Sequence, residues 1–277
     1  MIPDLNKQPL VSVLMTVYNR APYLPLAIQS VLDSSYKNFE LIIVDDCSTD
    51  QSMEIAQSYA QKDSRIRLYV NEKNLTDYPN RHRAASYAKG KYLKYLDSDD
   101  ALYPFGLEIM VNRMEAFPDA ALGLSKWSLG DRPFPVYLSP REAYQWSFLN
   151  NRYLFTNAPS SAIILKEAYD AVGGFTGLNQ VGDCEFWMIL AAKYPVVLIE
   201  GGTNWARDHQ DSEKYKDSAL KKAEMIFNLN KSALESPNNP LSDSEREKAI
   251  SLLIHAHTTW KRKYKIRLVI KKLKFFS

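Results

Sequence analysis

The first third of the chain alternates between apolar runs and helical patterns, and this alternation restricts the fold more than any other feature. The run 39–44 is almost continuously apolar, which is typical of a strand buried on both faces of a sheet. Strands that alternate with helices predict a mostly parallel sheet covered by helices, which is an α/β fold. The expected strands are 10–17, 39–44, 66–70 and 92–96, and the expected helices are 22–32, the segment that follows a Ser48–Gln51 capping box, and 80–89.

Acidic residues follow two of these expected strands. Asp45 and Asp46 follow the second strand, and Asp97, Asp99 and Asp100 follow the fourth. Side chains two apart on an extended chain face the same way, so Asp97 and Asp99 are expected to face one spot. Ligands of open α/β sheets bind at such strand ends, and paired carboxylates favour Mg²⁺ or Mn²⁺, which enters with the phosphates of a substrate. The alternative is an acidic turn in which Asp99 or Asp100 caps the next helix.

Glycine is absent from the chain before Gly90. The first three strand-to-helix turns therefore lack the glycines that a P-loop or a dinucleotide-binding G-x-G-x-x-G turn requires. This absence disfavours a dehydrogenase or a P-loop kinase. Carboxylates would instead hold the base and ribose of a nucleotide, and a metal would hold its phosphates.

Six segments, taken together, resemble the GT-A-fold family 2 glycosyltransferases, which are inverting enzymes that use nucleotide-sugar donors. They follow the order of the family from residue 10 to about residue 215, and the set is specific although each motif alone is weak. The resemblance implies a GT-A fold, with a mostly parallel twisted central sheet flanked by helices and a C-terminal helical extension. The segments are VSVLMTVYN at 11–19, LIIVDDCSTD at 41–50, GKYLKYLDSDD at 90–100, GGF at 173–175, VGDCEFW at 181–187 and WARDHQDS at 205–212.

The resemblance also implies a role for each matching residue. Asp183 matches the catalytic base, and Asp99 matches the metal ligand, with His209 of a mobile loop completing the coordination. Two residues depart from the family pattern: Cys47 replaces a common glycine, which puts the conformation of its loop in doubt, and Gly182 replaces a common Glu. The residues implied to bind the nucleotide sugar are Thr16, Tyr18, Asp46, Arg81, Asp97, Ser98 and Arg207.

Sugar transfer from a nucleoside diphosphate requires residues of these types. Negative charge develops on the leaving diphosphate, and a divalent ion neutralises that charge. A carboxylate accepts the proton of the acceptor hydroxyl. Asp183 lies at the start of an expected helix that includes 186–191, and the helix dipole is expected to keep its carboxylate ionised. Taken alone, Asp183 is better explained as a helix N-cap.

We predict a metal-dependent glycosyltransferase of the hexosyltransferase type, with Mn²⁺ or Mg²⁺ as its cofactor. The enzyme would transfer a sugar from a nucleotide-sugar donor, with UDP as the preferred nucleotide, to a hydroxyl of a cell-surface glycan or a lipid-linked acceptor in polysaccharide biosynthesis. One alternative is a nucleotide-sugar-binding paralogue without turnover. Another is a nucleotidyltransferase, which normally shows a glycine-rich, basic first loop that this chain lacks.

Aromatic residues gather after an expected strand at 121–127, and they are Trp127, Tyr137, Trp146 and Phe148. The alternatives for these residues are stacking on an acceptor sugar and packing in the core, and we expect core packing for most of them. Motifs do not define the sugar, the acceptor or the linkage, which depend on side chains in 125–160 and 200–216.

The chain of 277 residues, 45% of them apolar, is long enough to bury a core. We expect a catalytic domain over residues 1–216 and a C-terminal helical extension over 217–277. No apolar run approaches the ~20 residues that a membrane span requires. The two cysteines have no C-x-x-C spacing and no signal peptide precedes them, which predicts reduced thiols in a cytoplasmic enzyme.

Positive charge is concentrated at the C-terminus. Eight of the 35 Lys and Arg residues lie at 261–277, a stretch that holds none of the 32 Asp and Glu residues. Apolar side chains interleave with these cations, which suits an anionic membrane surface and predicts a peripheral enzyme at the inner face of the cell membrane. Nucleic acid is not an expected partner, because no base-reading motif accompanies the tail. A solvated, frayed terminus is the alternative.

Overall fold

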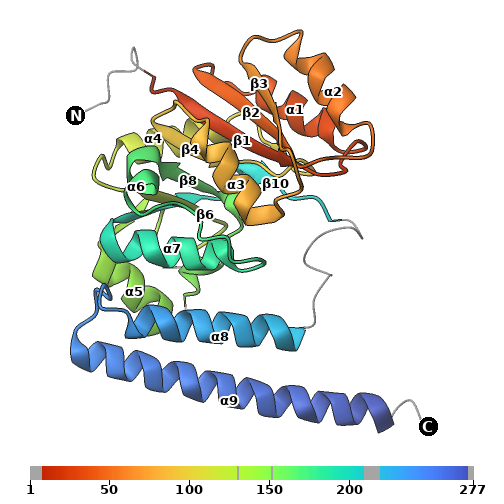
Figure 1. The fold of residues 1–277 in the computed structure, drawn as a ribbon. Coiled ribbons are helices and arrows are strands. Elements are labelled where there is room, and N and C mark those ends of the chain that lie inside the picture. Colours follow the sequence, from red (N-terminus) through yellow and green to blue (C-terminus); the bar gives the residue numbers. More distant parts are fainter. Residues whose placement is uncertain (1–7, 130, 151, 209–218, 274–277) are drawn as a thin grey trace.

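The computed structural model describes residues 8–129, 131–150, 152–208 and 219–273. An eight-stranded sheet forms its centre, and a two-stranded sheet pairs β5 (Ala101–Leu102) with β10 (Asn204–Trp205) (Figure 1). The strands of the large sheet are β1 (Val11–Val17), β2 (Phe39–Asp45), β3 (Ile66–Val70), β4 (Tyr92–Tyr95), β6 (Leu122–Lys126), β7 (Val136–Leu138), β8 (Ala162–Leu165) and β9 (Val196–Glu200).

Helices cover both faces of the large sheet. The first core cluster holds side chains of α3, α5 and α7, and the second holds side chains of α1, α2 and α4, so these two sets of helices pack on opposite faces. The helices are α1 (Leu24–Leu32), α2 (Ser52–Ala60), α3 (Asp77–Ser86), α4 (Gly106–Glu115), α5 (Pro140–Phe148), α6 (Lys166–Ala171), α7 (Gly182–Lys193), α8 (Ala219–Glu235) and α9 (Asp243–Leu273), with short 3₁₀ turns η1 (Leu154–Thr156) and η2 (Pro159–Ser161).

The strand order of the large sheet is β3-β2-β1-β4-β8-β6-β9-β7. The pairs β3–β2, β2–β1, β1–β4 and β6–β9 are parallel, which confirms the predicted mostly parallel sheet. Strand β8 runs antiparallel to both β4 and β6, so β6 and β9 run in the same direction as β4. The carboxyl ends of β1, β2, β4, β6 and β9 therefore lie along one edge, which we call the rim.

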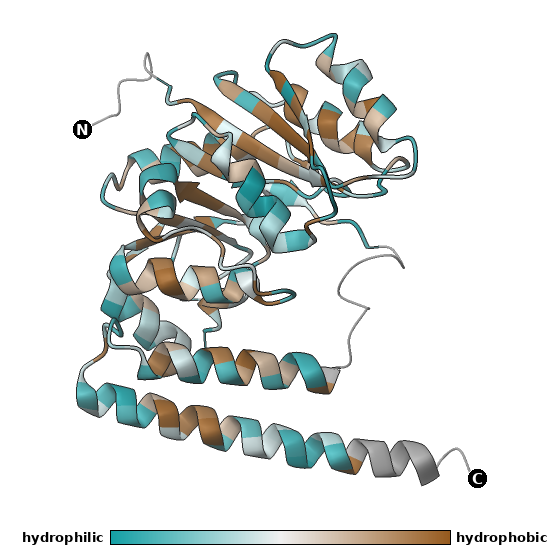
Figure 2. Ribbon diagram, viewed as in Figure 1, coloured by the Kyte–Doolittle hydropathy of each residue, from teal (hydrophilic) through white to brown (hydrophobic). Residues whose placement is uncertain are grey.

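The apolar pattern of the central strands accounts for the two core clusters. Every residue of β2 is buried, as expected of a strand covered on both faces. Successive side chains of a strand alternate between faces, so Leu14 and Ile42 join one cluster while Val13 and Ile43 join the other. Figure 2 shows these strands largely in brown, the colour of hydrophobic residues.

The core continues into the last two helices. Leu234, Leu241 and Ala249 are buried in the same cluster as α5 and α7, and α8 and α9 lie side by side at the far end of the molecule from α1 and α2 (Figure 1). Helix α9 has 31 residues, which corresponds to a length of about 45 Å. Among the described residues, the helices lack a stretch that is both long and apolar enough to span a bilayer.

Two local expectations and one alternative are wrong. The Ser48–Gln51 capping box does not form, because the Ser48 hydroxyl accepts the Asn19 N–H and α2 begins only at Ser52. Helix α3 begins at Asp77, three residues before the predicted start. Neither Asp99 nor Asp100 caps α4, whose N-cap is Phe105 without a side-chain hydrogen bond.

Candidate active site

Asp46 lies on the rim directly after β2 and is only 2% exposed. Its Oδ1 accepts the Asn71 side-chain amide at 2.7 Å and the Leu75 N–H at 2.8 Å, and its Oδ2 accepts the Thr76 N–H at 3.0 Å. Asp46 therefore holds the segment between β3 and α3 against the rim. A carboxylate oxygen accepts two donors, so Oδ2 retains the capacity for one more.

Backbone strain concentrates around Asp46. Cys47 adopts φ +65° and Thr76 adopts φ +69°, conformations that are unfavourable for residues other than glycine. Cys47 thus takes the backbone conformation that suits the glycine common in the family, which answers the doubt about this loop. Its thiol donates to the Asn71 carbonyl at 3.2 Å and so contributes to the same network.

Asp97 and Arg81 form a buried ion pair where the chain turns after β4. The Arg81 guanidinium lies 2.7 Å from Asp97 and 2.7 Å from Asp77, and only 8% of Arg81 is exposed. Burial disfavours the cation, but the carboxylates of Asp77 and Asp97 outweigh it and raise the pKa of Arg81. Arg81 therefore stays charged and fixes Asp97 beside α3.

Asp99 points to a different partner from Asp97, so the expectation that the two carboxylates face one spot is wrong. Strand β4 ends at Tyr95, and the turn that follows directs Asp99 to the Arg20 Nε at 3.2 Å. Arg207 meets the same turn: its N–H donates to the Asp100 carboxylate at 2.9 Å and its Nε donates to the Asp99 carbonyl at 3.0 Å. Two arginines and an acidic turn thus share this part of the rim.

Beneath the turn lies a buried lysine that the sequence analysis did not select. Lys94 is fully buried in β4, and its amino group donates to the Ser160 carbonyl. Burial lowers the pKa of Lys94 to about 7, although Asp97 and Asp100 oppose this shift. Burial and the charge of Asp97 raise the pKa of Asp100 to about 7. A lysine inside an otherwise apolar strand was the available signal for this site.

Asp183 is the second residue of α7, as predicted, but the helix is capped by Val181 rather than by Asp183. Its Oδ1 accepts the Cys184 N–H at 2.8 Å. Burial raises the pKa of Asp183 despite this hydrogen bond and the nearby charge of Arg81. Burial thus opposes the ionised form that the helix dipole is expected to favour. A raised pKa makes the carboxylate a stronger base once it is ionised.

Gly182 explains how α7 reaches Tyr78. A Cβ atom on Gly182 would lie 2.8 Å from the Cγ and 2.9 Å from the Cδ1 of the Tyr78 ring, closer than real Cβ atoms approach. The tyrosine ring therefore covers the start of α7, directly beside Asp183. The departure from the Glu common in the family is a packing requirement here.

We expect Gly182→Ala to destabilise the protein by about 1–3 kcal/mol, the usual cost of overpacking. Ordinary helix propensity predicts the opposite sign, because alanine is favoured over glycine in helices. A displaced Tyr78 would also move Asp183, and a shift of about 1 Å can cost on the order of 10²-fold in rate. Thermal denaturation and turnover of one sample test both effects, and a stabilised, fully active variant would contradict this packing.

The remaining candidates are placed at the same rim or lie outside the described residues. Thr16 is half-buried near the end of β1, Tyr18 is exposed just beyond it, and Ser98 is buried in the turn after β4. His209 lies outside the described residues. Arg20 and Tyr78 were missed by sequence reasoning, since their partners Asp99 and Asp183 are far away along the chain.

The acidic turn suits a divalent cation that binds with its substrate. Among the described residues, no cluster of three or more His, Cys, Asp or Glu side chains could enclose a metal ion. Mg²⁺ and similar ions usually bind through one or two carboxylates and complete their coordination with substrate phosphates and water. The Asp99 carboxylate on the acidic turn fits that pattern, whereas Asp97 is paired with Arg81.

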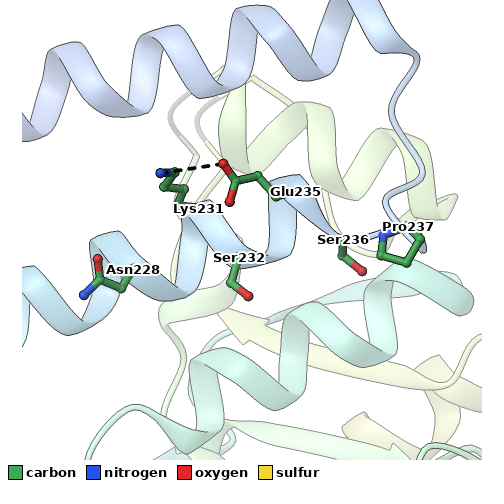
Figure 3. Close-up of a pocket in the computed structure, with 6 residues that line it drawn as sticks. All are labelled: Asn228, Lys231, Ser232, Glu235, Ser236 and Pro237. Carbon is green, nitrogen blue, oxygen red and sulfur yellow. Dashed lines mark ion pairs between the residues drawn. The ribbon is translucent and has the colours of Figure 1, made fainter.

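A hollow of about 400 Å³ lies away from the rim, at the end of α8 (Figure 3). Its lining is polar, and Lys231 and Glu235 pair across 3.7 Å within it. The lining residues are Asn228, Lys231, Ser232, Glu235, Ser236 and Pro237. None of the candidate residues contributes to this hollow.

The fold is shared with solved glycosyltransferase structures. The TarS 1–349 fragment of S. aureus, in complex with UDP-GlcNAc, aligns with a TM-score of 0.71 at 20% identity over 90% of this chain and 72% of the other. The mannosyltransferase PcManGT of Pyrobaculum calidifontis, in complex with GDP-Man and Mn²⁺, aligns with a TM-score of 0.65 at 16% identity over 92% of this chain and 75% of the other. These likenesses confirm the predicted GT-A fold.

Curated relatives are also glycosyltransferases. TuaG of Bacillus subtilis, named for teichuronic acid biosynthesis, is 44% identical over 95 residues, which are 34% of this chain and 38% of TuaG. The match to GlyG of Streptococcus pneumoniae serotype 4 is longer, with 28% identity over 76% of this chain and 81% of GlyG. An uncharacterized glycosyltransferase of Haemophilus influenzae matches over 38% of this chain and 42% of its own length. The chain thus spans only about two fifths of the length of this protein and of TuaG.

The family model of the glycosyl transferase family 2 matches residues 12–172, which include β1 to α6 and the acidic turn after β4. This match covers more than half of the chain. It contains Asp46, Arg81, Asp97 and Asp99 in the order that the sequence analysis identified. The chain therefore belongs to glycosyl transferase family 2.

Proposed function

We propose that this protein is a metal-dependent, inverting glycosyltransferase that moves a sugar from a UDP-sugar to a hydroxyl of a cell-surface glycan or a lipid-linked acceptor. The observation that carries the proposal is the continuous contact from the acidic turn to the start of α7. Arg81 joins Asp97 to α3, and the Tyr78 ring of α3 packs against Gly182, the residue before Asp183. Candidate donor-binding and base residues thus belong to one rigid unit.

Asp183 is the base in this proposal. Its carboxylate accepts the proton of the acceptor hydroxyl as the hydroxyl oxygen attacks the anomeric carbon of the donor sugar. Attack from the face opposite the leaving diphosphate inverts the anomeric configuration. Burial raises the pKa of Asp183, so the proton is held more firmly than by an exposed carboxylate.

The nucleotide is held by the other candidate residues. The remaining lone pair on Asp46 Oδ2 suits an N–H of the base, and Thr16 and Tyr18 would line the pocket beside it. Asp97 and Ser98 would contact the ribose and the donor sugar. Arg207 places a cation beside Asp99 and Asp100, where the diphosphate would lie.

A divalent cation, Mn²⁺ or Mg²⁺, would be held by Asp99 with His209 and would neutralise charge that develops on the diphosphate. Support for this assignment comes from the carboxylates of the acidic turn. The Mn²⁺ present with GDP-Man in the PcManGT structure, and the UDP-GlcNAc bound to TarS, support a metal and a nucleotide sugar for this chain.

A screen of nucleotide sugars tests the function. Thermal unfolding is measured with UDP-, GDP- and dTDP-sugars in the presence of MnCl₂, since a ligand at a hundred times its dissociation constant stabilises a protein by about 2.7 kcal/mol. The stabilising donor is then incubated with and without acceptor glycans, and products are analysed by mass spectrometry and anomeric NMR. A protein that neither binds nor cleaves any nucleotide sugar contradicts the proposal.

We also propose that residues 1–216 form the catalytic unit and that 217–277 anchor it at the cytoplasmic face of the membrane. Arg262, Lys263 and Lys265 are exposed on α9, as is Ile266, which is 50% exposed. Lys261 is different, because it pairs with Glu224 of α8 at 2.6 Å. Exposed cations next to an exposed aliphatic side chain suit an anionic lipid surface. Residues 274–277 lie outside the described part of the chain.

Replacing Arg262, Lys263 and Lys265 with Gln is expected to lower sedimentation with phosphatidylserine vesicles. Each cation near an anionic surface contributes about 1 kcal/mol, so binding should fall by about 10²-fold at low salt, and less at high salt where screening dominates. Lys261 is kept because it joins α8 to α9. Gln at the exposed Lys62, Lys73 and Lys89 serves as the control. Equal vesicle binding by both triple variants contradicts the anchor.

A further inference from the structure

Trp127 is unusually exposed for its size. At 83% it has the highest exposed fraction among the large hydrophobic side chains of the described residues, and Phe105 and Tyr153 follow at 65% each. Trp127 comes directly after β6, so it lies at the rim that also carries the acidic turn. Most aromatic residues near it behave as expected, and Phe148, for example, is buried in the core. Trp127 is the exception to the expected core packing.

The position of Trp127 is fixed although its ring is exposed. A Cβ atom on Gly201 would lie 3.0 Å from both the Cα and the Cε3 of Trp127. The indole therefore rests directly against the backbone at Gly201, and a Cβ atom there would have to push it away by a few tenths of an ångström. A ring held on one edge and open on its face is preorganised for stacking, because little side-chain entropy is lost on binding.

Tyr153 is held close to the same strand end. The amino group of Lys126, the residue before Trp127, donates to the Tyr153 carbonyl at 3.3 Å and to the Leu154 carbonyl at 3.4 Å. Tyr153 also adopts a left-handed backbone with φ +46°, an uncommon conformation for a bulky residue. Two exposed aromatic residues thus lie on segments that Lys126 ties together.

One connection links Trp127 to the acidic turn. The chain that follows Gly201 forms β10, which pairs with β5 directly after Asp100, and it ends at Arg207 on that turn. Strand β6 is two positions from β4 in the sheet, which separates their ends by about 10 Å.

We infer that Trp127 is the stacking platform for the saccharide chain of the acceptor; this inference rests on the proposed sugar transfer. The apolar face of a pyranose ring packs on an aromatic ring much as other apolar surfaces do. A separation of about 10 Å from the acidic turn places the platform away from the reacting hydroxyl, under a sugar further along the chain. The acceptor would therefore be an oligosaccharide rather than a monosaccharide.

An oligosaccharide array tests the platform. Labelled wild-type protein is applied with UDP and MnCl₂, and the dissociation constant of the best-bound oligosaccharide is then measured for each variant. Trp127→Ala is expected to weaken binding by about 30-fold, the loss typical of a central tryptophan, whereas Trp127→Phe keeps a ring and loses less. Gly201→Ala should weaken binding in the same direction by displacing the indole. Trp260→Ala, on α9, removes an indole elsewhere and should have no effect.

Kinetics separate this inference from the proposed function. In Trp127→Ala, the KM for the oligosaccharide should rise while kcat and donor hydrolysis without acceptor stay at wild-type values, because a distant contact contributes uniform binding. Oligosaccharide binding by Trp127→Ala within twofold of wild type overturns the platform, as does a wild type that cleaves a nucleotide sugar but binds no oligosaccharide. Vesicle binding lost in Trp127→Ala with an unchanged acceptor KM would make the residue a lipid contact instead. A wild type without any nucleotide-sugar activity would refute the proposed function itself.

Discussion

Replacing Asp183 with Asn is expected to lower turnover by about 10² to 10⁴-fold, the usual share of general base catalysis. The change keeps the size of the side chain and an oxygen that can accept the Cys184 N–H, but it removes the basicity. Burial already disfavours the charged carboxylate and raises its pKa, so loss of the charge should not unfold the protein. Turnover, donor affinity with Mn²⁺ and thermal stability are measured on one sample.

The pH dependence of the wild type gives a second measurement of the same residue. Asp183 accepts a proton only when ionised, so kcat should fall as pH decreases through its pKa. Because burial raises that pKa, the acid limb should lie above the range of an exposed aspartate, near 3.9. The limb should disappear in Asp183→Asn, whose residual rate is expected to be independent of this group.

Glu185→Gln is the matched control for Asp183→Asn. Glu185 also lies in the first turn of α7, so its loss changes the charge near the helix N-terminus by the same amount. Near-normal turnover is expected for this control. Normal turnover in Asp183→Asn would remove the residue from catalysis, and a matching loss of donor affinity would make it a binding residue.

The central strands could be predicted from the sequence because a strand that is buried on both faces consists almost entirely of apolar residues. Strand β3 has the predicted bounds, and β1 and β2 differ from their predictions by one residue. The short strands β5 and β10 have two residues each, too few for any periodicity to register. They pair only because the chain after β9 returns to the acidic turn, and this contact joins segments that are far apart in the sequence.

The start of α3 shows why helix ends were harder to predict. The Thr76 N–H is bound by Asp46, and the left-handed backbone at Thr76 precedes the first turn of α3 at Asp77. The determinant is therefore an acid thirty residues earlier in the chain. The sequence around α3 does not indicate such a contact. Ser48 is a second case, because its hydroxyl accepts the Asn19 N–H instead of capping α2.

The candidate site was predictable as a set of residue types but not as a set of contacts. Sequence placed Asp97 and Asp99 at a strand end, and the structure places both there. It could not show that Asp97 pairs with Arg81 while Asp99 pairs with Arg20, because β4 ends before the acids and the turn separates them. Gly182 looked like a departure from the family until Tyr78 was seen to cover it.

Removal of divalent cations with EDTA is expected to abolish sugar transfer, and MnCl₂ or MgCl₂ should restore it. A cation that neutralises the leaving diphosphate lowers the activation barrier by several kcal/mol. Asp99→Ala should therefore lower turnover in Mn²⁺ by on the order of 10³-fold. Asp99 carries this expectation because it lies on the acidic turn between Arg20 and Arg207. Full activity in EDTA would contradict the metal assignment.

Comparing nucleotide affinity with and without metal separates a metal ligand from a residue that merely shapes the turn. In MnCl₂, Asp99→Ala should bind UDP more weakly than wild type; in EDTA the two proteins should bind it about equally, because the carboxylate then has no cation to hold. A turn that is simply misfolded loses affinity in both buffers. Asp170→Ala, which removes an exposed carboxylate paired with Lys166 on α6, should match wild type in both. Arg20 lies 3.2 Å from Asp99, so Asp99→Ala also removes the partner of Arg20. The metal ligand is therefore identified by how much the effect of the mutation on UDP affinity depends on Mn²⁺, and not by the UDP affinity in one buffer.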